Sequence, residues 1–149
     1  NDKLFKYNYT NTLDTMFSFF NKKYKKISFE DVQNAIKQNY TIINTLSSNK
    51  QYCLIQNTIK HNEEENIINN LLNNYTSTHN YIIIYGENSA DESVEDKYDQ
   101  LIKCGFYNVF IYPGGLFEWL LLQDIYGADE FITTSNTLNI LNYKPNKQL

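Results

Sequence analysis

The sequence contains no arginine, and all 13 of its basic residues are lysines. Arginine provides the planar fork that binds phosphates and carboxylates through two hydrogen bonds at once. Phosphoryl chemistry that depends on an arginine is therefore not expected of this chain. The net charge of −4 is also unfavourable for a nucleic-acid partner, so none is predicted.

Cysteines and long apolar runs are equally scarce. The two cysteines, Cys53 and Cys104, lack the spacing of a metal-binding pair and are interpreted as structural thiols in a reducing compartment. No apolar run approaches the roughly 18 residues that a membrane helix needs. The first residues also lack the apolar core of a signal peptide. We therefore expect an intracellular, cytoplasmic protein without a membrane segment.

A chain of 149 residues is long enough for one domain with a single core. Residues 1–26 are predicted to be an N-terminal helical extension. Its apolar residues recur at helical spacing and are Leu13, Met16, Phe17 and Phe20. Residues 27–149 are predicted to be the folded domain, with a helical tail from about residue 128. In that tail Thr134 or Ser135 is expected to cap a short helix that packs through Leu138 and Leu141.

Segments of strand character alternate with segments of helical character along the rest of the chain. The predicted strands are 26–28, 40–46, 51–59, 81–85 and 108–112. One predicted helix begins after Ser28, and three others cover residues 62–76, 93–104 and 116–126. This alternation indicates an α/β fold whose sheet is mainly parallel.

The loop after residues 81–85 is the expected location of a functional site. The run YIIIY is apolar without alternation, which is typical of a strand buried on both faces. Open α/β sheets bind ligands beyond the carboxyl ends of their strands. Gly86 is the first residue beyond this strand, so the loop that it opens would hold a catalytic group if there is one.

The stretch from residue 81 to residue 119 resembles a rhodanese-like domain. The resemblance rests on YIIIY, Gly86, the run Gly105-Phe106-Tyr107-Asn108-Val109, the Gly114-Gly115 pair and Trp119. It implies a five-stranded, mainly parallel sheet flanked by helices on both faces. The first half of the chain matches more loosely, because Asn44 and Thr45 stand where the family has Asp and Arg.

Active members of that family carry sulfur on a cysteine that opens the loop, and here the position is Gly86. The resemblance thus implies a vestigial active-site loop without catalytic residues. Its members are Gly86, Glu87, Asn88, Ser89, Ala90, Asp91, Glu92 and Ser93. The loop has three carboxylates and no basic group, and it would repel thiosulfate or a persulfide anion. The related phosphatases need a loop cysteine and arginine, both of which are missing.

The acidic residues around the loop allow two interpretations. A hard cation could be held by Asp91, Glu92, Glu95 and Asp96, although their spacing matches no calcium loop. The favoured interpretation is that acidic residues stabilise the start of the next helix. Capping boxes would then pair Ser89 with Glu92 or Ser93 with Asp96. No metal and no cofactor are predicted.

Two further hypotheses concern a serine nucleophile and a partner surface. Ser89 or Ser93 would need a basic neighbour, and neither His61 nor His79 is placed beside the loop by the predicted elements. The helix over 116–126 is apolar on all sides, which indicates burial or a covering partner. A partner surface would consist of Leu116, Phe117, Trp119 and Leu120.

The sequence therefore predicts a non-catalytic, rhodanese-like binding or scaffold module. The expected partner is an unidentified protein or a second copy of the chain. The alternative is a divergent sulfurtransferase that uses a cysteine or a partner not identified in the sequence.

Overall fold

The structure, a computed structural model, describes residues 23–74 and 79–149. A parallel sheet of three strands forms its centre, in the order β1 (Thr41–Asn44), β2 (Tyr81–Tyr85) and β3 (Asn108–Tyr112). β2 lies in the middle and pairs with β3 along its whole length, from Tyr81 opposite Asn108 to Tyr85 opposite Tyr112. With β1 it pairs from Ile82 opposite Thr41 to Tyr85 opposite Asn44. The isoleucine-rich strands are buried from both sides, as their unalternated sequences predicted.

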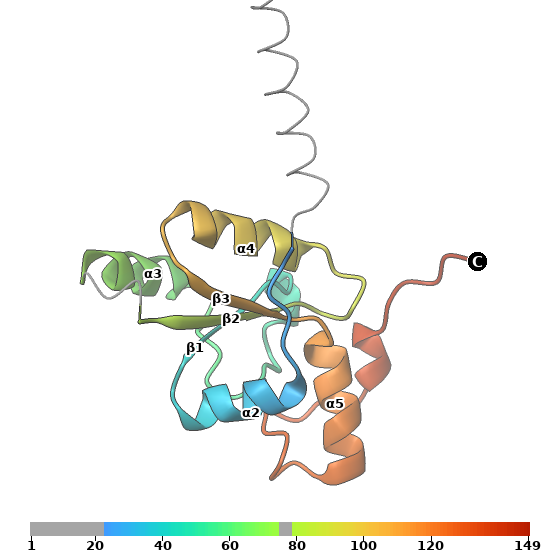
Figure 1. Cartoon of the computed structure of the whole chain (residues 1–149). Helices are drawn as coiled ribbons and strands as arrows, with labels where there is room; N and C mark the ends of the chain where they lie inside the picture. Colours follow the sequence, from blue (N-terminus) through green and yellow to red (C-terminus); the bar gives the residue numbers. More distant parts are fainter. Residues whose placement is uncertain (1–22, 75–78) are drawn as a thin grey trace, which may run out of the picture.

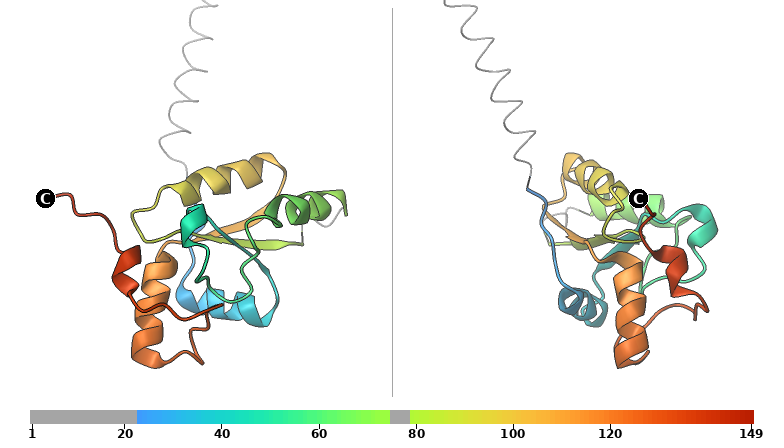
Figure 2. Two further views of the ribbon diagram at one scale, coloured as in Figure 1. Left: turned by 180° about the vertical axis from the view of Figure 1, so that it is seen from behind. Right: turned by 90° about the vertical axis from the view of Figure 1, so that its right-hand side faces the viewer.

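Two helices cover each face of the sheet (Figure 1). α2 (Phe29–Lys37) and α5 (Gly115–Tyr126) lie on one face, and α3 (Glu64–Asn73) and α4 (Ser93–Lys103) lie on the other. Figure 2 shows the same layers from behind and from the side. α2 begins after Ser28, as predicted, and a capping box stabilises its start, since the backbone N–H of Ser28 donates to Asp31 Oδ2 at 3.0 Å.

The hydrophobic core is divided by the sheet into two clusters. On the face of α2 and α5, Trp119 and Leu116 pack with Tyr85 and Tyr112 from the strands. On the opposite face, Tyr98 and Leu101 of α4 and the partly buried Ile68, Leu71 and Leu72 of α3 pack against strand isoleucines. This division confirms the predicted α/β class with helices on both faces.

The prediction of five strands is wrong, because the structure has three among the described residues. Where the fourth and fifth strands were expected, on the outer sides of β1 and β3, the described part of the chain forms only a single β-bridge on each side. Lys26 pairs with Ile111 beyond β3, and Thr58 pairs with Ile42 beyond β1, both in parallel. The chain turns away after one pair on each side, so no further ladder bonds form and neither segment is a strand.

The predicted strand over 51–59 is wrong for a related reason. Its apolar residues Cys53, Leu54 and Ile55 are buried, as they would be in a strand, but the segment consists of turns. Its backbone groups form hydrogen bonds mainly with side chains and with the C-terminal tail rather than with a neighbouring strand. The Ile55 N–H donates to Tyr85 Oη at 3.1 Å, and the Thr134 N–H donates to the Leu54 carbonyl at 2.8 Å.

The C-terminal tail also differs from the prediction. Its helical part is a short 3₁₀ helix, η2 (Ile140–Tyr143), and Leu138 and Leu141 are exposed rather than packed. Tyr143 is the buried residue of this helix. The predicted helix with Leu13, Met16, Phe17 and Phe20 lies outside the described residues, and the domain boundary at residue 26 stays a prediction. Among the described residues, no helix combines the length and apolarity that a membrane crossing requires.

Candidate functional site

The loop at Gly86–Ser93 lies where the sequence placed it, at the carboxyl end of the central strand β2. The start of α5 fixes its backbone: the Leu116 N–H donates to the Gly86 carbonyl at 3.0 Å, and the Phe117 N–H donates to the Glu87 carbonyl at 2.9 Å. These are amides of a helix N-terminus, which elsewhere bind anionic ligands. Here they are occupied by the loop itself.

The Gly-Gly turn that starts α5 packs directly against the loop. Gly115 has a φ of +66°, and a Cβ at this position would lie 2.7 Å from the Gly86 carbonyl oxygen. Glycine is therefore required here both by the backbone conformation and by the lack of space. The Gly114-Gly115 pair of the sequence motif thus has a structural role in bringing α5 to the loop.

Asp91 folds back into the loop and organises it. Its Oδ2 atom accepts a hydrogen bond from the Glu87 N–H at 2.9 Å. Its Oδ1 atom accepts from the Ser93 N–H at 3.1 Å and lies 2.5 Å from Ser93 Oγ. One carboxylate therefore ties the beginning of the loop to the beginning of α4, through charge-assisted hydrogen bonds.

The same carboxylate occupies the space beside Gly86. A Cβ built on Gly86 would lie 2.4 Å from Asp91 Oδ2 and 2.8 Å from Asp91 Cγ. It would also lie 3.0 Å from Val94 Cγ1. Any side chain at this position, including the cysteine of active rhodaneses, would have to displace Asp91. The sequence placed Asp91 in the loop but gave no sign of this role.

Neither of the capping boxes predicted for α4 is present. The residue that precedes the helix is Glu92, which makes no side-chain capping bond, and Ser93 is the first helical residue. The Ser93 hydroxyl instead lies 2.8 Å from Thr45 Oγ1 as well as beside Asp91, so its hydrogen-bonding capacity is taken. Within the described ranges, the acidic residues do not form a cluster of three metal-ligating side chains.

The loop meets two segments that the sequence did not connect with it. Lys50 forms an ion pair with Glu87 and donates to the Asn142 carbonyl at 3.1 Å. The Asn88 side-chain amide donates to the Tyr143 carbonyl at 2.9 Å. The expectation of a loop without basic residues holds for the loop itself, but a lysine from the 3₁₀ helix η1 (Ser48–Lys50) neutralises Glu87 from outside.

The C-terminal tail lies beside the loop and restricts the access of other molecules to it. A cavity of about 580 Å³ remains between them, with Lys50, Asp91 and Lys144 among its lining residues. The buried Asn44 and the partly buried Gln51 form an amide pair: Gln51 Nε2 donates to Asn44 Oδ1 at 2.7 Å, and Asn44 Nδ2 donates back to Gln51 Oε1 at 3.1 Å. Asn44, where the family has Asp, thus carries a neutral structural contact.

Neither cysteine belongs to the loop. Cys53 is fully buried, and its thiol donates to the Ser135 carbonyl at 3.2 Å. Burial raises the pKa of Cys53 above its ordinary value, which keeps the thiol protonated and unreactive. Cys104 is exposed, but it is the C-cap of α4 and stands at the opposite end of that helix from the loop.

The residues of α5 that the sequence offered as a possible partner surface face the domain's own core. Leu116, Trp119 and Leu120 are buried in the domain's own core, where Trp119 contacts the rings of Tyr112 and Phe131 at centroid distances of 6.2 and 5.0 Å. Phe117 is partly buried against the same cluster. The returning tail completes this cover, since the Ile132 carbonyl accepts a hydrogen bond from Trp119 Nε1 at 3.2 Å.

Comparison with known proteins gives structural but not sequence matches. The sequence matches no protein-family model and no curated protein. Ygr203w, a yeast protein tyrosine phosphatase of the rhodanese family, is similar in structure with a TM-score of 0.52 at 11% identity, over 78% of this chain and 95% of that one. The Alr3790 protein of Anabaena sp. gives a TM-score of 0.51 at 15% identity, over 78% and 96% of the two chains.

A third structure extends the likeness to more of this chain. The BH2092 protein of Bacillus halodurans gives a TM-score of 0.51 at 18% identity, over 85% of this chain and 84% of that one. At these identities the agreement concerns the fold. The order of parallel strands, the helices on both faces and these structural matches show that this chain has the rhodanese-like fold.

Proposed function

We propose that this chain is a non-catalytic rhodanese-like domain that acts as a binding or scaffold module. The observation that carries the proposal is the position of Asp91, whose carboxylate fills the space beside Gly86 where a nucleophile would stand. A site that has lost only its cysteine would keep an empty cradle. In this loop the Asp91 carboxylate occupies the space that the cysteine side chain would need.

The chemistry of sulfur transfer explains why this substitution matters. A persulfide-carrying loop needs backbone N–H groups that stabilise an anionic sulfur. In this chain the N–H groups of Glu87 and Ser93 already donate to Asp91. The loop therefore already holds a carboxylate in this place, and an anionic sulfur group would meet electrostatic repulsion from it at short range.

The sulfurtransferase alternative would need another sulfur carrier. Cys53 is buried and protonated, and Cys104 lies at the far end of α4 from the loop. Ygr203w is a protein tyrosine phosphatase, but phosphatase activity is not expected of this chain. The chain has neither a cysteine in its loop nor an arginine anywhere.

The test measures both activities on the purified chain. Thiosulfate with cyanide reports sulfur transfer, and p-nitrophenyl phosphate reports phosphatase activity. We expect the wild type and the Cys53→Ser/Cys104→Ser variant to remain at the background of a protein-free reaction in both assays. The double variant Gly86→Cys/Asp91→Ala restores a loop thiol and the space for it, and it serves as the matched comparison for thiosulfate-derived persulfide.

The outcome that overturns the proposal is wild-type turnover above that background. Activity that disappears in Cys53→Ser or Cys104→Ser would identify the sulfur carrier and establish the enzymatic alternative. Activity that persists in both variants but disappears in Asp91→Ala would assign catalysis to the loop carboxylate. Either result excludes a non-catalytic domain.

A further inference from the structure

The helix α3 has an apolar face that the domain covers only in part. Ile67, Ile68, Leu71 and Leu72 fall on this face, yet none of the residues of α3 is fully buried. The other three helices of the sheet layers each bury at least two residues. Partly covered apolar faces of this kind occur at sites where another molecule packs.

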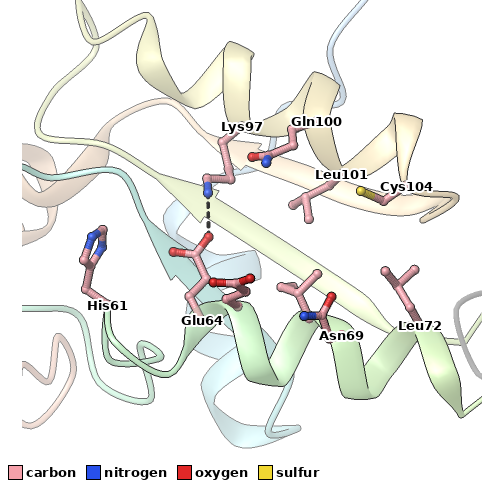
Figure 3. A pocket seen from close by; sticks show the side chains of 10 residues that line it. His61, Glu64, Asn69, Leu72, Lys97, Gln100, Leu101 and Cys104 are labelled. Atoms are coloured by element: carbon pink, nitrogen blue, oxygen red, sulfur yellow. Dashed lines mark hydrogen bonds and ion pairs between the residues drawn. The ribbon is translucent and has the colours of Figure 1, made fainter.

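A groove runs between α3 and α4 along this face (Figure 3). A cavity of about 410 Å³ occupies one part, with Ile68, Leu72 and Leu101 as its apolar lining. A second cavity of about 390 Å³ shares His61, Glu64, Lys97 and Gln100 with the first and continues to Thr45 and Ser93 beside the loop. The two cavities therefore form one continuous groove that ends at the Gly86–Ser93 loop.

The charged groups of the groove favour a basic occupant. Three carboxylates line it, from Glu64, Glu65 and Asp96, against the single ammonium group of Lys97. Lys97 Nζ is already paired with Glu64 Oε1 at 2.6 Å, as Figure 3 shows. In the part of the chain that the structure describes, Glu65 and Asp96 have no salt-bridge partner.

The Lys97–Glu64 pair also shows how the groove accommodates an alkylammonium group. The side chain of Lys97 extends from α4 toward α3 and brings its ammonium to a carboxylate beside apolar side chains. A lysine from another molecule would find the same combination at Glu65 or Asp96. Such a segment would also need apolar side chains for Ile68 and Leu72, as amphipathic helices bound in grooves have.

We propose that the groove between α3 and α4 binds a basic amphipathic helix of a partner protein. Its apolar side would pack on Ile68 and Leu72, and its lysines or arginines would pair with Glu65 and Asp96. This inference rests on the proposed function, because it gives the binding module a surface and a class of partner. It replaces the partner surface on α5 that the sequence suggested.

Cys104 provides a reporter for the groove within the unmodified chain. It is exposed and lines the groove, whereas Cys53 is buried, so a thiol reagent reacts selectively at Cys104. The experiment measures the alkylation rate of Cys104 in the full chain with increasing amounts of an amphipathic leucine–lysine peptide of about 15 residues, long enough to form a helix. The matched peptide carries glutamate in place of every lysine.

We expect the lysine peptide to slow alkylation saturably and the glutamate peptide to have no effect. Reversing the charges of the groove in Glu65→Lys/Asp96→Lys should raise the Kd for the lysine peptide by about tenfold, since each partly exposed ion pair contributes only modestly to the binding free energy. Leu72→Ala should weaken it through lost apolar contact. Asp124→Lys, an exposed substitution on α5 across the sheet, is the control and should leave the Kd unchanged.

Three results would overturn the proposal. The first is equal protection by both peptides, and the second is a Kd that does not respond to the charge reversal. The third is protection that rises with protein concentration alone together with a doubled molecular mass, because the occupant would then be a second copy. Enzymatic turnover by the wild type would remove the proposed function but leave these binding results interpretable, so the two failures are distinguishable.

Discussion

The substitution Gly86→Ala tests whether the Asp91 carboxylate controls the loop. The new Cβ would lie 2.4 Å from Asp91 Oδ2 and 2.8 Å from its Cγ, closer than non-bonded atoms can remain. The backbone of Gly86 is not in the left-handed region, so alanine adds no conformational strain of its own. Most of the effect should therefore come from the displacement of the Asp91 side chain, with a smaller contribution from Val94 Cγ1 at 3.0 Å.

The magnitude follows from the contacts that Asp91 would lose. Its carboxylate binds the Glu87 N–H at 2.9 Å and the Ser93 N–H at 3.1 Å. Breaking these bonds and crowding the loop should lower the free energy of unfolding by about 2–4 kcal/mol. In an Asp91→Ala background only Val94 Cγ1, at 3.0 Å, remains close to the new Cβ, and Gly86→Ala should then change stability by less than about 1 kcal/mol. The coupling between the two positions is thus expected to be about 2 kcal/mol.

Urea denaturation of the four proteins of this double-mutant cycle gives the coupling directly, and thermal unfolding should show shifts of about 3 °C per kcal/mol. Gly105→Ala is the matched control: its φ is +104° and a Cβ there meets no atom within 4 Å. It should cost about 1 kcal/mol in both backgrounds, because only backbone strain is involved. Additive effects of Gly86→Ala and Asp91→Ala would refute the reasoning.

Three other predictions concern the surroundings of the loop. Gly115→Ala should destabilise the domain by about 3 kcal/mol in urea denaturation, because its positive φ and the adjacent backbone leave no room for a Cβ. The raised pKa of Cys53 means that the folded state keeps a proton that the unfolded chain loses above its ordinary pKa of 9.0. Stability should therefore fall between pH 8 and pH 10, and less so in Cys53→Ala, as measured by urea denaturation at both pH values. Tyr143→Phe should stay within about 0.5 kcal/mol of wild type, since the buried hydroxyl has no hydrogen-bond partner among the described residues. Tyr143→Ala, in the same assay, should cost about 3–5 kcal/mol through the cavity it leaves; equal effects of the two substitutions would contradict this account.

The sequence predicted the centre of the fold well because its signals are local. β2 and β3 have the predicted bounds, since each is a short apolar run closed by a glycine-containing loop. The helix predicted over 93–104 is observed over Ser93–Lys103 for the same reason, with Gly105 just beyond it. Such patterns depend on residues close in the chain, which a sequence displays directly.

The errors arose where burial and hydrogen bonding come from distant segments. Cys53, Leu54 and Ile55 are apolar because the core needs them, but their backbone is satisfied by Tyr85 and by the tail near Thr134 rather than by a neighbouring strand. An apolar run can therefore be buried without being a strand. The apolar sequence of α5 was compatible with burial or with a partner surface, and the structure shows that Leu116, Trp119 and Leu120 are buried.

The candidate site was located but its internal arrangement was not predicted. Gly86 at the nucleophile position could be read from the motif, and the structure places it at the carboxyl end of β2. The role of Asp91 depends on its side chain folding back toward Gly86, five residues earlier in the sequence. The ion pair between Lys50 and Glu87 joins residues 37 positions apart. The sequence shows that the loop is acidic, but only the three-dimensional structure shows which of its carboxylates fills the space beside Gly86.

The single bridges at the two outer positions of the sheet have a consequence for recognition. Ile27 and Lys25 take up the exposed carbonyl and N–H of Ile111, and Ile59 takes up the carbonyl of Ile42. An incoming peptide that tried to extend the sheet as an additional strand would find its main-chain partners interrupted on both sides. We therefore expect little edge-to-edge pairing between copies of the domain, and the groove proposed above would recognise its partner through side chains rather than through a shared backbone ladder.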